Sequence, residues 1–323
     1  MSTTLDPETR LDNQQSTQTA AERIRHSFAA CRVKFKWFGT SKTLNSEQKS
    51  QAAESFGAEG DSISAGKKLI DTKHDAYKAL TSIKSQVTRF WKDNSLPYPE
   101  SGIRLIKQDR IDEFNATLES YKEQLESSVR MLDDHFAEIK EAARQRLGSL
   151  YDSSDYPNSL DDEFDVQWDF PSVEPPSYLQ QLNPELYQEQ ARRVSQRFER
   201  AVELAEQTFI EELDRLVNHL AERLSGDDDG RPKIFRDSAV ENLSAFFTRF
   251  RELNVRSNDQ LDELVERCEQ LMNGVQPQGL RDNDSLRLNV ATQMSGIQAN
   301  LDQLLTDRPR RRILRRNQAS DGE

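Results

Sequence analysis

The feature that most constrains this chain is an apolar repeat between residues 187 and 224. Stepping along it by four, three and four residues meets an apolar side chain every time, while the other faces are almost wholly Gln, Arg and Glu. The repeat has about 3.67 residues per turn and predicts one long helix with a straight apolar stripe, close to 60 Å in length. The stripe contains Tyr187, Ala191, Val194, Phe198, Val202, Ala205, Phe209, Leu213, Leu216, Leu220 and Leu224. A helix of this length needs a partner to cover its stripe.

A second apolar stripe of similar length lies earlier in the chain. It contains Ile111, Phe114, Leu118, Tyr121, Leu125, Val129, Leu132, Phe136, Ile139, Ala143, Leu147 and Leu150. The simplest way to bury both stripes is to pack the rods, at about 108–150 and 185–224, antiparallel against each other. The sequence therefore predicts a mainly α fold: an elongated, coiled-coil-like hairpin of two long helices, with shorter helices and a small two-stranded antiparallel β ribbon.

The ribbon is expected from two short alternating segments. Residues 32–38 alternate basic side chains with apolar ones, and residues 164–170 alternate acidic or amide side chains with apolar ones. Opposite charges on one face and aromatics on the other are what cross-strand neighbours favour. We expect the two segments to pair through Lys34, Lys36, Trp37, Asp165, Trp168 and Asp169. The second segment lies in an acidic connector at 151–184, which has no Lys or Arg between Tyr151 and Pro176.

The remaining patterns complete the predicted organisation. Residues 1–18 are rich in Thr, Ser, Gln and Asp and are expected to be disordered. Residues 19–307 are expected to form a single elongated helical domain, ending in C-terminal helices within 237–307. These helices are predicted at Ser238–Leu253, Ser257–Met272 and Ser285–Leu305. Residues 308–323 form a basic tail.

Composition excludes several classes of protein. Apolar content is 35%, charged content is 31%, and the formal net charge is -12, which argues against a general polyanion binder. The two cysteines, Cys31 and Cys268, fit no disulfide or metal-binding spacing, which favours a reducing, cytoplasmic setting. No apolar run reaches the roughly 18 residues of a membrane span, so no membrane association is expected.

No motif predicts catalysis, a cofactor or a metal. Gly60 to Lys68 has five residues between its glycines, where a phosphate-binding loop has four, and Lys68 stands where that motif has Ser or Thr. The cluster Asp133, Asp134, His135 and Glu138 lacks the Glu-x-x-His spacing of di-iron bundles and is typical of a solvated helix face. We therefore expect a protein that is not an enzyme.

The C-terminal tail carries the sharpest concentration of charge. It contains Arg308, Arg310, Arg311, Arg312, Arg315 and Arg316, around Ile313 and Leu314. Such a cluster can grip nucleic acid phosphates or an acidic partner. It can equally complement a helix dipole, or fold back on the acidic connector. The basic and aromatic segment at 32–38 could also bind single strands, but internal pairing with 164–170 is the preferred interpretation.

One resemblance adds to this interpretation. Phe35-Lys-Trp-Phe-Gly39, with Lys42 and Leu44, followed by Gly66-Lys-Lys-Leu-Ile-Asp71, resembles a bacterial and phage family named domain of unknown function 3150, over residues 32–150. Members are often encoded beside MoxR-like AAA ATPases and von Willebrand A-domain proteins. The resemblance implies a bacterial origin and an ATPase partner, and it supplies no catalytic residues.

The resulting expectation is a helical scaffold or adaptor that binds protein partners, with a MoxR-like AAA ATPase system as the partner that the resemblance implies. The alternative is a nucleic-acid-associated protein that uses the arginine-rich tail. Oligomeric state stays open, because the same stripes could be covered within one chain or between two.

Overall fold

The computed structural model describes residues 19–225 and 236–306, and these divide into two compact units. About two thirds of the chain is helical and about a tenth is strand. Unit 2 comprises residues 27–96 and 100–188, and the described residues of unit 1 are 19–26, 97–99, 189–225 and 236–306. The predicted disorder at 1–18 and the basic tail at 308–323 lie outside the described residues. The sequence predicts a single helical domain at 19–307, whereas the described residues divide into two compact units.

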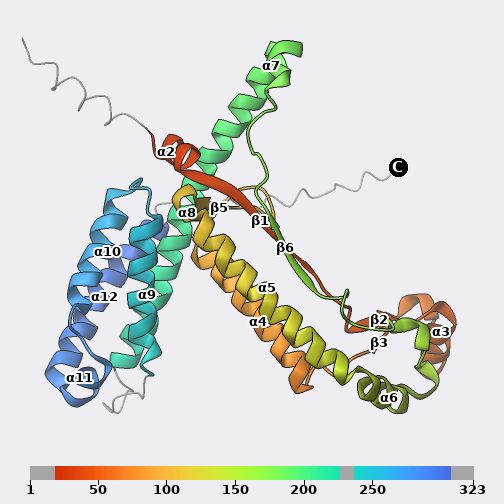
Figure 1. Ribbon diagram of the computed structural model, residues 1–323. Coiled ribbons are helices and arrows are strands. Elements are labelled where there is room, and N and C mark those ends of the chain that lie inside the picture. The colour runs from red at the N-terminus through yellow and green to blue at the C-terminus, as the bar shows by residue number, and fades with distance from the viewer. Residues whose placement is uncertain (1–18, 226–235, 307–323) are drawn as a thin grey trace, which may run out of the picture. The chain divides into compact units, whose positions relative to one another are not determined.

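Unit 2 is built on a four-stranded sheet in the order β4-β5-β1-β6 (Figure 1). Its strands are β1 (Phe28–Lys36), β4 (Leu96–Pro97), β5 (Arg104–Lys107) and β6 (Asp165–Asp169), and β2 (Ser41–Thr43) pairs separately with β3 (Gly66–Lys68). The helices are α3 (Ser46–Glu54), α4 (Asp75–Asp93), α5 (Ile111–Asp134), α6 (Phe136–Leu147) and α7 (Tyr178–Leu182). Short 3-10 turns occur at η2 (Gly60–Ser62), η3 (Gln108–Arg110), η4 (Gly148–Leu150) and η5 (Ser153–Asp155).

The two alternating segments pair antiparallel, as their charges and aromatic residues predict. Arg32 lies opposite Asp169, and Lys36 lies opposite Asp165. The first half of β1 pairs with β5, from Phe28 opposite Lys107 to Cys31 opposite Arg104. The predicted two-stranded ribbon is therefore part of a larger sheet, because β5 also hydrogen-bonds to β1.

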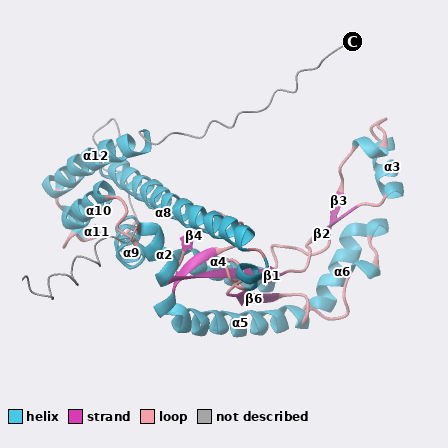
Figure 2. Cartoon of the chain, turned by 90° about the horizontal axis from the view of Figure 1, so that it is seen from above, coloured by secondary structure: helices cyan, strands magenta, loops and turns pink. Residues whose placement is uncertain are grey.

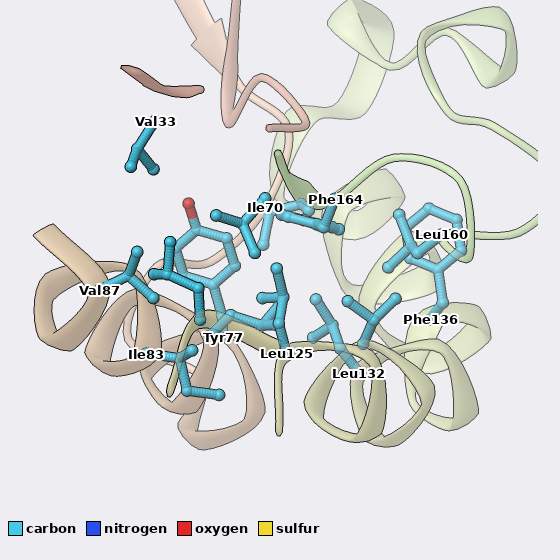
Figure 3. Close-up of a cluster of buried hydrophobic side chains, with 14 of the residues drawn as sticks. Val33, Ile70, Tyr77, Ile83, Val87, Leu125, Leu132, Phe136, Leu160 and Phe164 are labelled. Carbon is cyan, nitrogen blue, oxygen red and sulfur yellow. The ribbon is translucent and has the colours of Figure 1, made fainter. Parts of the chain in front are cut away.

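The core of unit 2 lies between this sheet and the pair α4 and α5. Phe90 of α4 stacks on Phe114 of α5, with ring centroids 5.2 Å apart. Figure 2 shows α5 running beside β1 and β6, and the Trp168 indole donates a 2.8 Å hydrogen bond to the Asn115 side chain. In Figure 3, Tyr77, Leu125 and other buried side chains converge from helices, sheet and connector. The α5 stripe is thus covered by α4 and the sheet.

The first predicted rod is two helices rather than one. Helix α5 ends at Asp134 and α6 begins at Phe136, with His135 between them at φ -95° and ψ 0°. The sequence has no Pro or Gly at this break. It coincides with a tertiary contact, in which the Asp133 carboxylate accepts a 2.7 Å hydrogen bond from the Leu160 amide of the connector. Because the break lies on this contact, helical periodicity alone does not reveal it.

Unit 1 is a helical bundle. Its elements are α2 (Ala20–Ser27), α8 (Pro184–Ser225), α9 (Ser238–Leu253), α10 (Asp259–Met272), α11 (Pro277–Asp282) and α12 (Asp284–Thr306). The 42-residue α8 is the long helix that the apolar repeat predicts. Its Phe209 ring lies 5.0 Å from the ring of Phe250 in α9, centroid to centroid, and Figure 1 shows α9, α10 and α12 side by side.

The expected hairpin of two long helices is found only in part: the second rod is the single long helix α8, and the first is divided into α5 and α6. The stripe of α5 is buried in unit 2, whereas the stripe of α8 is buried from Val194 onward in unit 1, where Phe209 and Glu212 contact α9. A stripe predicts that a helix face is covered, but it does not predict which neighbour covers it.

The three C-terminal helices are found within two residues of their predicted bounds, and the short α11 was not predicted. Cys268 of α10 and Met294 of α12 place their sulfur atoms 3.9 Å apart in the bundle core. Burial raises the pKa of the Cys268 thiol to about 12. Among the described residues, no helix combines the length and apolarity required to cross a bilayer.

Candidate interaction surfaces

The basic side chains on the charged face of the β1–β6 pair are bound by acidic side chains and carbonyl groups of unit 2. Arg32 donates two hydrogen bonds to the Asp169 carboxylate, the shorter at 2.8 Å, and the Lys34 ammonium lies 3.6 Å from the same carboxylate. These contacts, led by the Arg32 hydrogen bond, hold the pKa of Asp169 below its usual value. Lys36 donates to the backbone carbonyl of Asp162. The basic side chains of this strand therefore have acidic and carbonyl partners inside unit 2.

The aromatic face of the same pair is also occupied. The Trp37 ring meets Phe164 edge to face at 4.9 Å, and the Lys84 ammonium sits 4.4 Å from the centroid of Trp37. Trp168 is tied to α5 through Asn115. Trp37 and Trp168 therefore serve the core, which weakens the interpretation of residues 32–38 as a surface that stacks bases.

The acidic connector is anchored by a buried ion-pair cluster. The Lys67 ammonium lies 2.6 Å from the Asp155 carboxylate and donates a 2.7 Å hydrogen bond to the Leu150 carbonyl, and Lys42 contacts the other oxygen of Asp155. Burial raises the pKa of Asp155, but the two ammonium groups outweigh it and hold that pKa below its usual value. Lys67, which belongs to the segment resembling a phosphate loop, thus has a structural partner.

The acidic cluster on the first rod, at residues 133–138, also makes contacts within unit 2. Asp133 accepts hydrogen bonds from the Leu160 amide and the Ser159 hydroxyl, and the His135 ring lies 3.6 Å from Glu138. The His135 ring also lies 5.6 Å from that of His74, centroid to centroid. Within the described ranges, no group of three or more His, Cys, Asp or Glu side chains could hold a metal ion.

An exposed apolar patch lies at the end of the connector, at the junction of α7 and α8. The exposed fractions of Tyr178, Leu182 and Leu186 are 60%, 77% and 37%. Asn183 separates the two helices and accepts a 3.0 Å hydrogen bond on its side chain from the Leu186 amide. We call Tyr178, Leu182 and Leu186 the 178–186 patch. Scattered apolar side chains are normal on a surface, but three large ones within nine residues form a candidate docking site.

A groove of about 460 Å³ lies in unit 1 between α10 and α12. Its lining is Gln260, Glu263, Leu264, Arg267, Asn300, Gln303 and Leu304. Leu264 is buried and Leu304 half-buried, whereas the remaining side chains of the lining are polar and exposed. The groove therefore has a narrow apolar floor and polar walls, a shape that suits an amphipathic segment.

No protein-family model, no curated protein and no solved structure matches the chain. The resemblance to the domain of unknown function 3150 family therefore stays an expectation, and the function has to be argued from the geometry of the chain itself.

The sequence indicated some of these residues and missed others. The predicted strand pair of Lys34, Lys36, Trp37, Asp165, Trp168 and Asp169 is brought together, but in an internal role. The six predicted arginines, Arg308 to Arg316, lie outside the described residues. Sequence reasoning missed the 178–186 patch, although its signal was present: Tyr178, Leu182 and Leu186 recur every four residues. The Asp155 cluster joins residues far apart in the chain, and no local pattern announces it.

Proposed function

We propose that this chain is a non-enzymatic helical adaptor that docks a protein partner through the 178–186 patch. The observation that carries the proposal is the exposure of three large apolar side chains on the short helix α7 and on the first turn of α8. Burying one such side chain completely contributes about 1.5 to 3 kcal/mol, so a partner that covers the patch gains several kcal/mol before the costs of association.

The charge around the patch specifies the chemistry of the partner. From Leu147 to Ala191 the chain has no Lys or Arg, and it has ten Asp and Glu residues. Four of the ten, Asp155, Asp165, Asp169 and Glu189, are paired with Lys or Arg of the same chain, and the others leave this segment acidic. Two copies of such a surface would repel each other. A partner with an apolar groove rimmed by Lys or Arg would complement it, in the way that an amphipathic helix binds in a groove.

The proposal can be tested by site-specific cross-linking in the native cell. A photoreactive amino acid at Leu182 should capture a single protein, whereas the same amino acid at Met131, which is 56% exposed in α5, should not. A MoxR-like AAA ATPase is the first candidate, because of the resemblance described above, and the setting is expected to be the cytoplasm of a bacterium.

Affinity measurements with the purified partner then decide the role of the patch. Tyr178→Ala, Leu182→Ala and Leu186→Ala combined should weaken binding at least about tenfold. The matched control is Met131→Ala with Leu288→Ala, which changes exposed apolar side chains elsewhere and should leave the affinity unchanged. Equal binding by the patch variant and the control would reject the proposal.

A nucleic-acid-associated role is the second candidate, and its support is the set of six arginines between Arg308 and Arg316. The internal pairing of Arg32 and Lys36 makes the other basic segment a weaker candidate for this role. Titration with single- and double-stranded DNA at 50 and 200 mM salt tests it, because phosphate contacts give a steep salt dependence. Absence of binding at physiological salt would reject it.

A further inference from the structure

The groove between α10 and α12 lies at the end of unit 1 from which the chain continues past Thr306. Cys268 faces Met294 in the core, and Gln260 and Glu263, near the start of α10, share the groove with Asn300, Gln303 and Leu304, near the end of α12. The two helices therefore run antiparallel. It follows that Thr306, the last described residue, lies at the same end of the bundle as the first turn of α10.

The exposed face of α10 next to this groove is acidic. Asp259, Glu263 and Glu266 are exposed, and within the described residues no Lys or Arg forms an ion pair with them. Glu266 accepts a 3.2 Å hydrogen bond from the Gln270 amide, Asp262 accepts from the Asn254 amide at 2.7 Å, and Glu269 lies 3.0 Å from Arg251. Acidic side chains in the first turn of a helix are favoured by the helix dipole, which accounts for Asp259. Glu266 lies beyond the first turn and is not explained in that way.

We propose that residues 308–316 of the same chain fold back into this groove. Six arginines in that segment match the three carboxylates that have no Lys or Arg partner among the described residues, and Ile313 and Leu314 match the apolar floor of Leu264 and Leu304. Nine residues in extended form span up to about 30 Å, and the 14-residue α10 is about 21 Å long, so the segment can reach the whole groove. Arg267 also lines the groove and opposes the contact, which limits its strength.

In this arrangement the groove competes with external ligands for the arginines of residues 308–316. While residues 308–316 occupy the groove, the arginines are not available to a nucleic acid or to an acidic partner. The contact depends on exposed ion pairs, so rising ionic strength releases the tail. The inference is independent of the 178–186 patch, because it uses other residues and a different unit.

Cross-linking within the full chain tests the contact directly. A photoreactive amino acid at Ile313 should form cross-links to peptides containing residues 260–267 or 300–304, identified by mass spectrometry. A mixture of isotopically light and heavy chains distinguishes cross-links within one chain from those between two. Predominant cross-links to residues 151–189, to a second copy, or to no preferred peptide would overturn the proposal.

Charge-neutralising variants provide the second arm. Glu263→Gln with Glu266→Gln should lower the yield of these cross-links about threefold or more, because two ion pairs are lost. The matched control is Glu199→Gln with Glu222→Gln, an equal change of charge at two exposed positions of α8. An equal fall in yield for both variants would mean that only net charge matters, and it would overturn the proposed docking in the groove.

Discussion

The ammonium group of Lys67 lies 2.6 Å from the carboxylate of Asp155, and the two side chains are only 5% and 1% exposed. Lys67 belongs to β3 and Asp155 to the connector that follows α6, so this pair joins segments 88 positions apart by number. Lys42 closes the cluster from its exposed side. A buried ion pair offsets its own desolvation only while both charges are present. The connector is therefore held in place by a contact that is sensitive to the loss of either partner.

Asp155→Asn should destabilise unit 2 by about 3 kcal/mol, because it leaves the Lys67 ammonium buried without its counter-charge. Lys67→Met combined with Asp155→Leu should cost less, since neither charge then remains. Urea unfolding, followed by hydrogen exchange in α5 and β6, measures both effects. Asp75→Asn is the control, because the Asp75 side chain is 96% exposed in its ion pair with Lys78, and it should leave the midpoint unchanged. A double variant as unstable as the single one would contradict this account.

Acid should weaken the same contact. The net effect of burial and of the two ammonium groups lowers the folded-state pKa of Asp155 below 3.8, so the unfolded chain binds this proton more readily. The stabilisation is complete above about pH 4 and is lost as the pH falls through the lower, folded-state pKa. Thermal midpoints between pH 7 and pH 2.5 should fall less steeply for Asp155→Asn than for the unaltered protein. Parallel profiles would show that other carboxylates account for the acid sensitivity.

The two cores should respond separately to a buried charge. Leu125 is 2% exposed in unit 2 and Leu213 is fully buried in unit 1. Leu125→Asp should remove several kcal/mol, roughly 3 or more, from unit 2, and Leu213→Asp should do the same to unit 1. Hydrogen exchange resolved by peptide should show the loss of protection in the unit that carries the change. Gln124→Asp, at an exposed neighbour, is the control. Complete unfolding of both units by either variant would contradict separate cores.

Asp214 of α8 should make the bundle less stable when it is ionised. Burial first, and the nearby charge of Asp302 second, raise the pKa of Asp214, against a weaker effect of the hydrogen bond from Asn218. A raised carboxyl pKa means that the folded state disfavours the ionised form, so stability falls as the pH rises above 3.8. Asp214→Asn keeps the acceptor for Asn218 and removes the charge. We expect the thermal midpoint at pH 7 to rise by about 1 to 2 °C.

The gain from Asp214→Asn should vanish below about pH 3, where the carboxyl group is protonated in both states. Asp302→Asn should reproduce part of the gain at pH 7, because it removes the repulsion and leaves the burial of Asp214 in place. A midpoint that falls in either variant would show that these carboxylates have stabilising partners.

Much of the local structure could be predicted from residues close together in the chain. The apolar repeat predicted α8, and the alternation at 32–38 and 164–170 predicted that β1 and β6 pair, because side-chain period reports helix or strand directly. The charges on the two strands also predicted their contact, since Arg32 and Asp169 meet as opposite signs across the pair. The Asp155 cluster and the groove between α10 and α12 could not be predicted, because each joins distant side chains.

The amino-acid sequence by itself determined which faces of the helices and strands are buried. Only the tertiary structure decided what covers them: α4 and the sheet for α5, and the helices of unit 1 for α8. The physical reason is that burial of apolar surface has no direction and accepts any neighbour of suitable shape. Packing and connectivity therefore choose the neighbour, and they leave Tyr178, Leu182 and Leu186 exposed.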